Sequence, residues 1–368
     1  MQSVNDGYRS VMADHRINLI VIFGGQSAEH DVSCVTATHV LRAVDQSRYR
    51  ITPIGIDREG NWQLATAAIA ALAAGPGSLP DRLEAVGDAL SPSPMLAAAN
   101  ADGPMVVMPL LHGPLGEDGT VQGLLELMDV AYVGSGVLGS AVSMDKAIAK
   151  EVFAHHGIAQ ARWISVREHE ITPTRLAEIA QTLGLPVFVK PSNMGSSVGV
   201  TKATTTAELQ AAVEHALSYD EWVVIEEAIR GREIEVAVLG NLEPRASVPG
   251  EVVPGHEFYD YEDKYLDDRA QLLIPAALSA EQTTTVRDLA VKVFRTLRCD
   301  GLARVDFFFE QDGRGFLVNE VNTMPGFTPI SMYPKLWQHS GLSYAELVDT
   351  LIDLAFERHR RRRRNTKH

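Results

Sequence analysis

Acidic and amide side chains on two predicted strands, between Arg304 and Asn322, are the residues whose types and spacing most directly indicate chemistry. The two strands are joined by a tight turn at Asp312-Gly313-Arg314. Because successive side chains point to opposite faces of a strand, Arg304 and Asp306 share one face, and Glu320 and Asn322 share one face of the second strand. A turn centred on Gly313 pairs Asp306 with Glu320, and Arg304 with Asn322.

Two opposed carboxylates at this place need a positive charge between them. The Cβ atoms of such a pair lie about 4.5–5.5 Å apart, and like charges there are destabilising. A divalent cation removes the conflict, and two carboxylates with one carboxamide oxygen are hard ligands that suit Mg²⁺ held together with phosphate oxygens. Asp306, Glu320 and Asn322 are therefore predicted metal ligands. The alternative is a structural hairpin whose acids are neutralised by Arg304 or by protonation.

A loop of small residues between two other predicted strands is a candidate phosphate site. It follows Lys190 and contains Gly195, Ser196 and Ser197. Small residues let backbone N–H groups approach a phosphate, serine hydroxyls add donors, and the lysine adds a compact positive charge. The loop lacks the GxxxxGK[ST] pattern that leads into a helix in the P-loop. The alternative is a flexible hairpin tip without a ligand.

The strand that ends at Glu226-Glu227 and the strand that begins at Arg232 indicate a nucleoside pocket. The end of a strand followed by a turn offers backbone N–H and C=O groups to a base. A carboxylate such as Glu233 suits a ribose hydroxyl. The alternative is a solvated acidic turn.

Gly134–Gly139 matches GxGxxG between a predicted strand and a predicted helix. A dinucleotide site also needs an acid about 20 residues further on, at the end of the next strand. Residues 154–162 offer no acid, so we interpret the glycines as a turn. The helix behind them carries Lys146, which is a second candidate phosphate ligand unless it is simply solvated.

Two polar loops after predicted strands are weaker candidates. In the first, Gly24–Asp31, Glu29 can hold a substrate ammonium group, or it can cap the following helix, whose N-terminus favours negative charge. The second loop, His112–Gly119, has a similar composition. Taken alone, both loops favour the structural interpretation.

Composition places the chain among ordinary globular proteins, with 45% hydrophobic and 22% charged residues. Its 368 residues suffice for two or three domains. No apolar run approaches the roughly 18 residues that span a bilayer, and residues 1–16 lack the apolar core of a secretory signal. Cys34 and Cys299 are single and far apart, so they form neither a disulfide framework nor a metal motif. We expect a reducing, cytoplasmic setting.

The net charge of −14 conceals a basic C-terminus. Residues 358–368 carry six arginines and one lysine, which leaves −21 on the rest of the chain. An acidic body disfavours a general nucleic-acid-binding role. We expect residues 358–368 to form a solvated, disordered tail.

The order of predicted elements favours an α/β protein with more than one domain. Strands and helices alternate from 18 to 134, whereas antiparallel hairpins follow from 185. The stretch 65–103 is rich in small residues and reads as a short helix with a loose insertion. Residues 249–272 show no periodicity, which is typical of a lid or of disorder. Long helices are predicted over 140–156, 280–297 and 344–358.

Seven ordered motifs resemble those of the D-alanine–D-alanine ligases, a family of the ATP-grasp superfamily. From Phe23 to Thr328 they are FGGQSAEHDVS, LHGPLGEDGTVQG, SMDK, VKPSNMGSSVGV, FYDYEDKY, RVDFFF and NEVNTMPGFT. The resemblance implies a three-domain α/β fold with mixed or antiparallel central and C-terminal sheets, and ATP bound between those two domains. The implied parts are an N-terminal extension (1–16), a substrate domain (17–134), a central domain (135–225) and a C-terminal domain (226–357) with a lid (249–272).

The resemblance also implies a role for each matching residue. Two Mg²⁺ ions, or Mn²⁺ in their place, would lie between Asp306, Glu320 and Asn322. The first D-alanine would lie by Glu29, Ser196 and His112, the second by Ser331 and Met332, and a reaction oxyanion by Arg304 and the Gly326 backbone N–H. ATP would contact a larger set, namely Lys146, Lys190, Gly195, Ser196, Ser197, Glu226, Glu227, Ala228, Ile229, Glu233, Lys264, Phe308 and Asn319.

The implied activity joins two D-alanine molecules through a D-alanyl phosphate, with ATP as phosphoryl donor, for peptidoglycan synthesis. In the family, a tyrosine at the place of Tyr265, hydrogen-bonded to Ser196 and Glu29, accompanies an amine as the second nucleophile, so a dipeptide product is expected. A homodimer formed through the N-terminal domain is also implied. The alternatives are an ATP-grasp ligase for another acid or amine, a nicotinamide-dependent oxidoreductase that uses Gly134–Gly139, and a non-catalytic nucleotide sensor.

Overall fold

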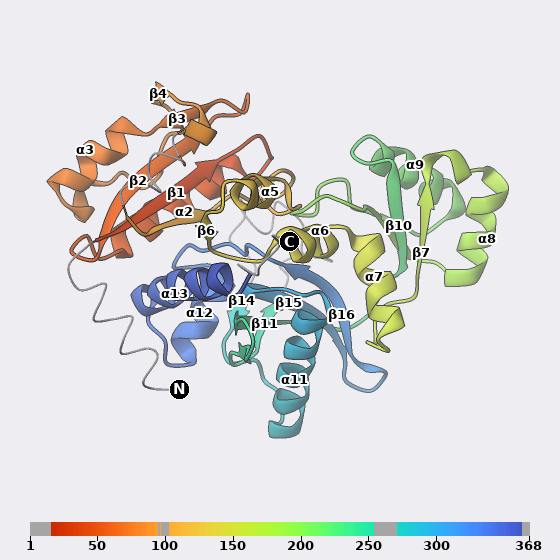
Figure 1. Cartoon of the computed structure of the whole chain (residues 1–368). Coiled ribbons are helices and arrows are strands. Elements are labelled where there is room, and N and C mark those ends of the chain that lie inside the picture. Colours follow the sequence, from red (N-terminus) through yellow and green to blue (C-terminus); the bar gives the residue numbers. More distant parts are fainter. Residues whose placement is uncertain (1–15, 95, 97–102, 254–270, 363–368) are drawn as a thin grey trace, which may run out of the picture.

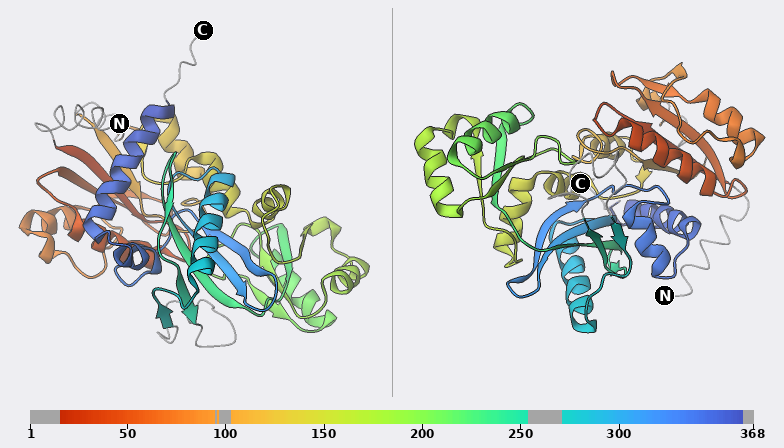
Figure 2. Two further views of the ribbon diagram at one scale, coloured as in Figure 1. Left: turned by 90° about the horizontal axis from the view of Figure 1, so that it is seen from below. Right: turned by 180° about the vertical axis from the view of Figure 1, so that it is seen from behind.

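Three β-sheets organise the chain, each built from a different stretch of the sequence (Figure 1). The computed structural model describes residues 16–94, 96, 103–253 and 271–362. The N-terminal and central sheets lie on opposite sides of the molecule, with the C-terminal sheet between them, and Figure 2 shows the same order from behind. The α/β class predicted from the sequence is confirmed.

The N-terminal sheet is mostly parallel and has the strand order β4-β3-β2-β1-β5-β6. Its strand β1 (Ile17–Gly24) is buried along nearly its whole length, as its apolar sequence predicts for a parallel strand covered on both faces. The remaining strands are β2 (Tyr49–Ile56), β3 (Trp62–Leu64), β4 (Asp88–Ala89), β5 (Met105–Pro109) and β6 (Ala131–Tyr132). The helices of this part are α2 (His30–Ala43), α3 (Thr66–Ala74), the short η1 (Pro76–Ser78) and α5 (Thr120–Leu127).

The central sheet is antiparallel throughout and has the order β7-β10-β8-β9. Helices α8 and α9 bury their apolar faces against it in a separate core. Its strands are β7 (Trp163–Arg167), β8 (Val187–Pro191), β9 (Thr201–Ala203) and β10 (Trp222–Glu227). Its helices are α6 (Val137–Met144), α7 (Lys146–His155), η2 (Glu168–Glu170), α8 (Pro173–Leu183) and α9 (Thr206–Leu217).

The C-terminal sheet is also antiparallel, with the order β14-β13-β11-β15-β16 and β12 paired to β11. Helix α11 (Ala280–Thr296) packs Val286, Val293 and Phe294 against one face of the sheet, which leaves the other face for polar side chains. The strands are β11 (Arg232–Gly240), β12 (Arg245–Ala246), β13 (Gly250–Val253), β14 (Gln271–Leu273), β15 (Gly301–Glu310) and β16 (Gly315–Asn322). Two helices follow, α12 (Met332–His339) and α13 (Tyr344–Arg362).

The single helix predicted over residues 140–156 is wrong, because the chain forms two helices that meet at Asp145. The backbone of Asp145 is extended, with ψ of 102°, and it ends α6. Its side chain then accepts a hydrogen bond from the backbone N–H of Ile148 and caps α7. An aspartate at an N-cap satisfies a backbone donor that a continuous helix would have paired differently. The break places Lys146 in the first turn of α7.

Gly134 and Gly136 lie in the bend between β6 and α6, as predicted, whereas Gly139 lies within α6. They allow close packing rather than dinucleotide binding. Gly134 has a φ of 99°, and a Cβ at Gly301 would lie 3.2 Å from the Gly134 backbone nitrogen. The bend therefore joins the N-terminal sheet to the start of β15.

The aperiodic segment predicted over 249–272 begins and ends in two paired strands, so the prediction is wrong for Gly250–Val253 of β13 and for the start of β14 at Gln271. Val253 at the end of β13 pairs with Gln271 at the start of β14, so both ends of the segment meet at one edge of the C-terminal sheet. Residues 254–270 themselves lie outside the described residues, as do 1–15 and 363–368. Of the helices described, none is long and apolar enough to cross a membrane.

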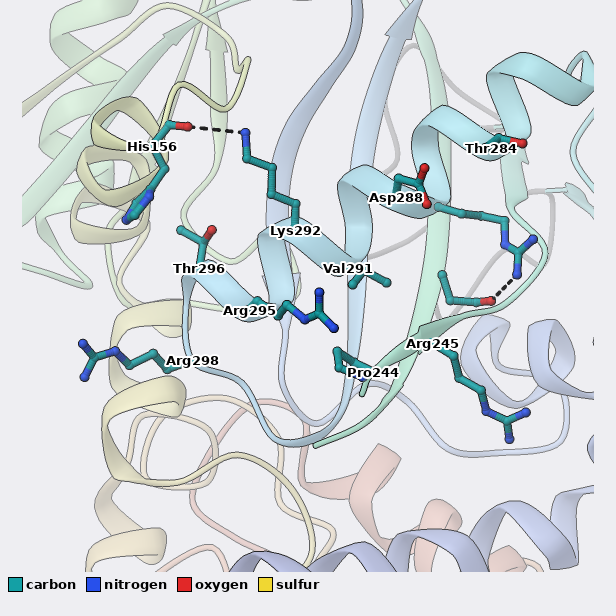
Figure 3. A pocket seen from close by; sticks show the side chains of 12 residues that line it. His156, Pro244, Arg245, Thr284, Asp288, Val291, Lys292, Arg295, Thr296 and Arg298 are labelled. Carbon is teal, nitrogen blue, oxygen red and sulfur yellow. Dashed lines mark hydrogen bonds between the residues drawn. The ribbon is translucent and has the colours of Figure 1, made fainter. Parts of the chain in front are cut away.

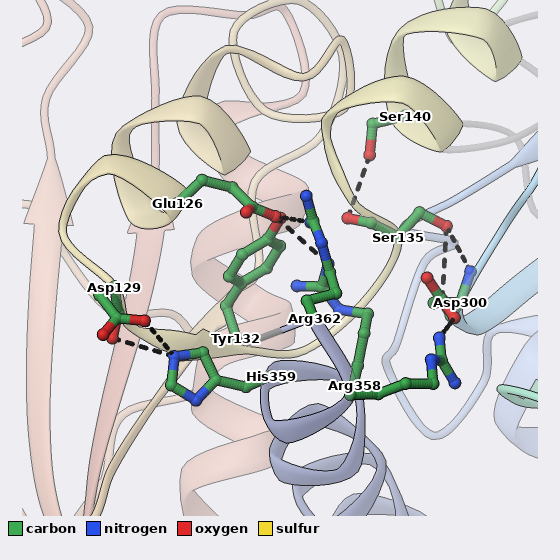
Figure 4. Close-up of polar contacts among 10 residues, drawn as sticks. Glu126, Asp129, Tyr132, Ser135, Ser140, Asp300, Arg358, His359 and Arg362 are labelled. Carbon is green, nitrogen blue, oxygen red and sulfur yellow. Dashed lines mark hydrogen bonds and ion pairs between the residues drawn. The ribbon is translucent and has the colours of Figure 1, made fainter. Parts of the chain in front are cut away.

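Helix α13 continues to Arg362, so a disordered tail is wrong for residues 358–362. These residues bind the N-terminal sheet and its neighbours (Figure 4). Arg358 is buried, with its guanidinium carbon 3.9 Å from the centroid of the Tyr132 ring and its Nη1 3.4 Å from Glu126 Oε1. Further pairs join Arg362 to Glu126, Arg361 to Asp300 and His359 to Asp129. An arginine run that the sequence alone assigns to solvent is held here by acids from two other segments, the end of α5 and Asp300.

The two arginines that share Glu126 should differ in their effect on stability. Arg358→Ala removes a buried cation and its packing on Tyr132, and we expect it to lower the free energy of unfolding by about 3 kcal/mol. Arg362→Ala is the matched control, because the side chain is 47% exposed, and it should cost less than about 1 kcal/mol. Urea denaturation followed by circular dichroism measures both. Equal losses would show that burial does not decide the contribution.

Candidate active site

The hairpin of β15 and β16 places the predicted metal ligands opposite one another. Asp306 pairs with Glu320, and Arg304 with Asn322, as the alternation of side chains predicted. The register shifts by one residue after Asp306, so that Glu310 faces Gly315 at the turn. The turn centred on Gly313 therefore predicts the wrong partners for residues 307–310, which lie next to the turn. Beyond a β-bulge, the partners of residues 304–306 are those predicted.

The extra residue of the bulge is Asn319, because Val318 and Glu320 both have partners on β15. In a regular strand, the neighbours Asn319 and Glu320 would point to opposite faces. Here both are partly exposed, while Val318 and Val321 on either side are buried. The bulge therefore adds Asn319, a predicted ATP contact, to the polar face of the sheet.

This polar face collects side chains from three neighbouring strands. On β11, Glu235 faces Asp306 and Glu233 faces Phe308. The residues in between, such as Val305 and Phe307, point into the core beneath α11. The face therefore combines one half-buried aromatic ring, Phe308, with four carboxylates and two carboxamides, contributed by Glu233, Glu235, Asp306, Glu320, Asn319 and Asn322.

Arg304 balances the most buried of these acids. Its Nε and Nη2 donate to the two oxygens of Asp306 at 2.7 Å each, and its Nε lies 3.0 Å from Glu235 Oε2. Burial lowers the pKa of Arg304, but Asp306 and Glu235 outweigh burial and raise the pKa well above its usual range. Asn322 Nδ2 also donates to Asp306 at 2.9 Å. The alternative interpretation, a structural hairpin whose acids are neutralised by Arg304, is thus correct in part, since Arg304 neutralises Asp306.

A buried triad of one acid and two lysines faces the hairpin from the central sheet. Lys190 on β8 and Glu226 on β10 share a face, and their Nζ and Oε2 atoms are 3.0 Å apart. Lys150 of α7 lies 3.0 Å from the other oxygen of Glu226. The second oxygen partner of Lys190 is Asn319 Oδ1 at 3.4 Å. Glu226, predicted at adenine or ribose, has its carboxylate between two lysines.

The two lysines hold the carboxylate of Glu226 in its charged form. Burial raises the pKa of Glu226, but Lys150 and Lys190 outweigh burial and bring the pKa to about 2. Burial lowers the pKa of Lys150 in spite of Glu226. For Lys190 the opposite holds, because Glu226 and Glu320 outweigh burial and raise its pKa. Lys190 is therefore a fixed positive charge at the edge of the site.

The break before α7 anchors the small-residue loop. Asp145 accepts hydrogen bonds from Ser192 Oγ at 2.6 Å and from Asn193 Nδ2 at 3.2 Å. Lys146 Nζ donates to the Met194 carbonyl at 2.5 Å and lies 3.8 Å from Glu320 Oε2. The two predicted phosphate lysines, Lys146 and Lys190, thus both lie beside the acidic hairpin.

The tip of this loop reaches the N-terminal sheet. Ser196 Oγ donates to Glu29 Oε1 at 2.5 Å. A Cβ at Gly195 would lie 3.2 Å from Glu29 Oε2, so glycine permits the approach. Ser196 and Ser197 have φ values of 49° and 58°, which keeps the loop tightly curved. Glu29 and Ser196, which were both predicted at the first D-alanine, are therefore in direct contact.

A second polar loop connects the N-terminal sheet to the end of the hairpin. His112 is buried, and its Nδ1 lies 2.9 Å from the Met324 carbonyl. Glu117 accepts from the backbone N–H groups of Gly113 at 2.7 Å and of Met324 at 3.1 Å. Burial and the charge of Glu29 raise the pKa of Glu117 to about 8. Glu117 therefore holds the loop of His112 against the residues that follow β16.

The residues predicted for the second substrate lie at the start of α12. Ser331 is the N-cap, and its Oγ accepts from the Thr328 backbone N–H at 3.1 Å. A Cβ at Gly326 would lie 3.1 Å from Ser331 Oγ, so the Gly326 backbone runs close to the serine. The side chain of Met332 is buried in the core, which leaves only its backbone for a ligand.

The other predicted ATP contacts surround the end of β10. Glu227 is held by Arg162 at 2.8 Å and by Arg314 at 2.5 Å, so its side chain is occupied, and its backbone N–H donates to the Arg162 carbonyl at 3.0 Å. Ala228 donates its backbone N–H to the Pro186 carbonyl, and Ile229 follows it toward β11. Lys264 and Tyr265 lie outside the described residues.

Sequence reasoning missed three residues that organise this site, Lys150, Glu117 and Glu235. Each is buried and is recognised only by its partner. Lys150 alone carried a local signal, since it follows Lys146 by four residues in a helix and shares its face. Nothing in the local sequence distinguishes Glu235 or Glu117 from a solvated acid.

The class of this protein is defined by two antiparallel sheets that meet at a polar site. Lysines approach this site from the central part, and acids approach it from the C-terminal sheet. Lys190 touches Asn319, and Lys146 lies beside Glu320, so the central and C-terminal parts of the chain meet at these residues. The fold and the site are those of an ATP-grasp ligase.

The chain belongs to the D-alanine–D-alanine ligase family. The family model described as "D-ala D-ala ligase C-terminus" matches residues 152–353, and that described as "D-ala D-ala ligase N-terminus" matches residues 18–135. The D-alanine--D-alanine ligase of Bacillus pumilus is 47% identical over 94% of this chain and 97% of its own length. That of Clostridium acetobutylicum is 47% identical over 92% of this chain and 97% of its own length. Family membership identifies the chain as a ligase that uses ATP.

Solved structures agree with this assignment. The D-alanine-D-alanine ligase from Coxiella burnetii aligns with a TM-score of 0.78 and 35% identity, covering 94% of this chain and 95% of that one. The VanG D-Ala:D-Ser ligase from Enterococcus faecalis aligns with a TM-score of 0.79 and 34% identity, covering 93% of this chain and all of that one. Overall fold similarity therefore does not distinguish the second substrate.

The charge of Glu226 should make stability depend on pH in a defined range. Its pKa is about 2 in the folded protein and 4.5 as the ordinary value. A lowered pKa contributes stability above the ordinary value, and this contribution is lost as the pH falls from about 4.5 toward 2. The wild type should be more stable than Glu226→Gln at pH 6, and the difference should narrow below pH 4.5. Urea denaturation of both proteins from pH 6 to pH 3 measures it. A difference that is constant over this range would contradict the assignment.

Proposed function

We propose that this protein joins two D-alanine molecules into D-alanyl-D-alanine, with ATP as the phosphoryl donor, and so supplies peptidoglycan synthesis. The observation that carries the proposal is the 2.5 Å contact between Ser196 and Glu29. It joins the phosphate loop to the N-terminal sheet beside Lys146, so an ammonium group and a terminal phosphate can be bound next to each other. A substrate that is both an amine and a carboxylate fits this place.

The first step transfers the γ-phosphoryl group of ATP to the carboxylate of the first D-alanine. An oxygen–phosphorus bond forms, the bond from that phosphorus to ADP breaks, and an acyl phosphate results. Catalysis of this step consists mainly of positioning and charge stabilisation. Lys146, Lys190 and the backbone N–H groups of the Gly195–Ser197 loop supply positive potential for the phosphates. Glu226 and Lys150 fix the direction of Lys190.

The acidic hairpin fits a divalent cation. Asp306, Glu320 and Asn322 share one polar face and offer hard oxygen ligands. Glu320 is 28% exposed, and Lys146 Nζ lies 3.8 Å from its Oε2. We propose that these three residues hold two Mg²⁺ ions, with Mn²⁺ able to substitute, and that the metal supplies charge neutralisation at the transferring phosphate.

The second step is attack by the amine of the second D-alanine on the acyl phosphate. A tetrahedral oxyanion forms, and phosphate leaves as the carbonyl is restored. Arg304, which is fixed by Asp306 and Glu235, and the Gly326 backbone N–H would stabilise the oxyanion. The N-terminus of α12 at Ser331 and Met332 favours the carboxylate of the second D-alanine. His112 would complete the pocket of the first D-alanine.

The segment between β13 and β14 would close the site, because an acyl phosphate hydrolyses readily and needs protection from water. Its two ends are fixed side by side at the sheet edge. We propose that Lys264 contacts the phosphates and that Tyr265 joins Glu29 and Ser196 to favour an amine as the second nucleophile. We also propose a cytoplasmic homodimer.

One assay tests the proposed reaction and its specificity. ADP release with ATP and Mg²⁺ is measured with D-alanine, L-alanine, D-lactate added to D-alanine, and D-serine added to D-alanine, and the product mass is determined. D-alanine alone should give the dipeptide mass, and L-alanine should give no product. A depsipeptide from D-lactate would contradict the part given to Tyr265. A mixed product formed in preference from D-serine would reassign the protein to the activity named for the Enterococcus faecalis relative.

Substitution of the central hairpin acid tests the metal assignment. Asp306→Asn removes a charged ligand, and we expect turnover to fall by at least about 100-fold and to need more Mg²⁺. Asp312→Asn in the exposed turn of the same hairpin is the matched control and should keep wild-type turnover. Initial rates across a Mg²⁺ titration measure both variants. Near-normal turnover of Asp306→Asn at every Mg²⁺ concentration would exclude Asp306 as a ligand.

A further inference from the structure

A basic groove of about 870 Å³ lies on the outer side of α11, between that helix, β12 and the end of α7 (Figure 3). Five of the residues that line it are cations, and Asp288 is its one acid. We call it the α11 groove, and its cations are Arg245, Arg287, Lys292, Arg295 and Arg298. Figure 3 shows Lys292 reaching toward the carbonyl of His156. Arg287 Nη2 donates to the Ala246 carbonyl of β12 at 2.9 Å.

The α11 groove is distinct from the active site. Val286, Val293 and Phe294 form the buried side of α11 and pack against one face of the C-terminal sheet. The acidic hairpin residues point away from this core, on the opposite face of the same sheet. The helix and one layer of sheet therefore separate the two places.

The cations of the groove differ from most other arginines on the surface. Elsewhere, many surface arginines are paired with acids, as in Arg42 with Asp81, Arg167 with Glu221 and Arg175 with Glu178. Within the described part of the chain, the five groove cations form no ion pair with an acid. The chain carries 47 acids against 33 lysines and arginines, so acids for pairing were abundant. Arg245 lies 5.0 Å from the centroid of the Trp337 ring, and Arg287 and Lys292 donate to backbone carbonyls, but no acid among the described residues neutralises these cations. Cations without an acid partner along one groove favour an anionic occupant.

The dimensions of the groove indicate a small molecule with several anionic groups. Its volume falls within the range of about 300–1,000 Å³ that is usual for small-ligand sites. Arg287 and Arg295 are eight residues apart on the helix, which corresponds to about 12 Å at 1.5 Å per residue. One inorganic ion cannot bridge that span, whereas a chain of phosphates can contact successive cations. Arginine also presents a planar fork that matches phosphate oxygens.

We propose that the α11 groove binds a small polyanion with two or more linked phosphate groups, at a site separate from the ATP site. The groove variant Arg295→Gln/Arg298→Gln tests this, because neither side chain has a hydrogen bond or ion pair with another described residue and the fold should be kept. The matched control Arg50→Gln/Arg175→Gln removes the same charge outside the groove.

Calorimetric titration of the full-length protein with inorganic tripolyphosphate measures the binding. The wild type and the control should bind equally, and the groove variant should bind at least about tenfold more weakly. The groove variant should keep the wild-type KM for ATP in the ADP-release assay, which separates this result from a failure of the active site. Equal binding by all three proteins would overturn the proposal, and so would competition in which saturating ATP removes all tripolyphosphate binding.

Discussion

Charge compensation between the central and C-terminal sheets is the constraint on which the rest of the site depends. On the central side, Glu226 holds Lys150 and Lys190 together at 3.0 Å each. On the hairpin side, Arg304 holds Asp306 and Glu235. The central set has one acid between two lysines, and the hairpin set has one arginine between two acids. Fixed lysines on the central side therefore face fixed acids on the hairpin side. Because a buried charge without a partner is costly, these sets can exist only where both sheets are packed around them.

Irregular backbone positions these groups more than regular structure does. The extended residue Asp145 ends α6 and directs Lys146 toward the loop. The bulge at Asn319 turns two consecutive polar residues to one face of the hairpin. Gly195 allows the loop to approach Glu29. Each irregularity lies at the point where a side chain must meet a different segment of the chain. Irregular backbone of this kind is common at functional sites.

The two basic regions of the structure differ in whether acidic side chains lie beside them. Arg358 and Arg361 at the end of α13 find acids on the N-terminal part and at Asp300, and they fasten the last helix. The cations on the outer side of α11 find no acid among the described residues and line an open groove. Both regions are rich in arginine, so composition does not distinguish them. The nearby acids make the end of α13 a structural contact, and the lack of such pairing among the described residues leaves the α11 groove able to bind an anion.

The sequence by itself determined the class of fold, the alternation of side chains that pairs Asp306 with Glu320, and the motifs that identify the family. These depend on local periodicity and on residue spacing along one chain segment. Only the tertiary structure decided that residues 140–156 divide at Asp145, that residues 358–362 are helical, and that Lys150 and Glu235 complete the charge sets. The physical reason is that burial and pairing arise between segments far apart in sequence, such as α7 with β10 and α13 with β6, and no local pattern encodes the partner.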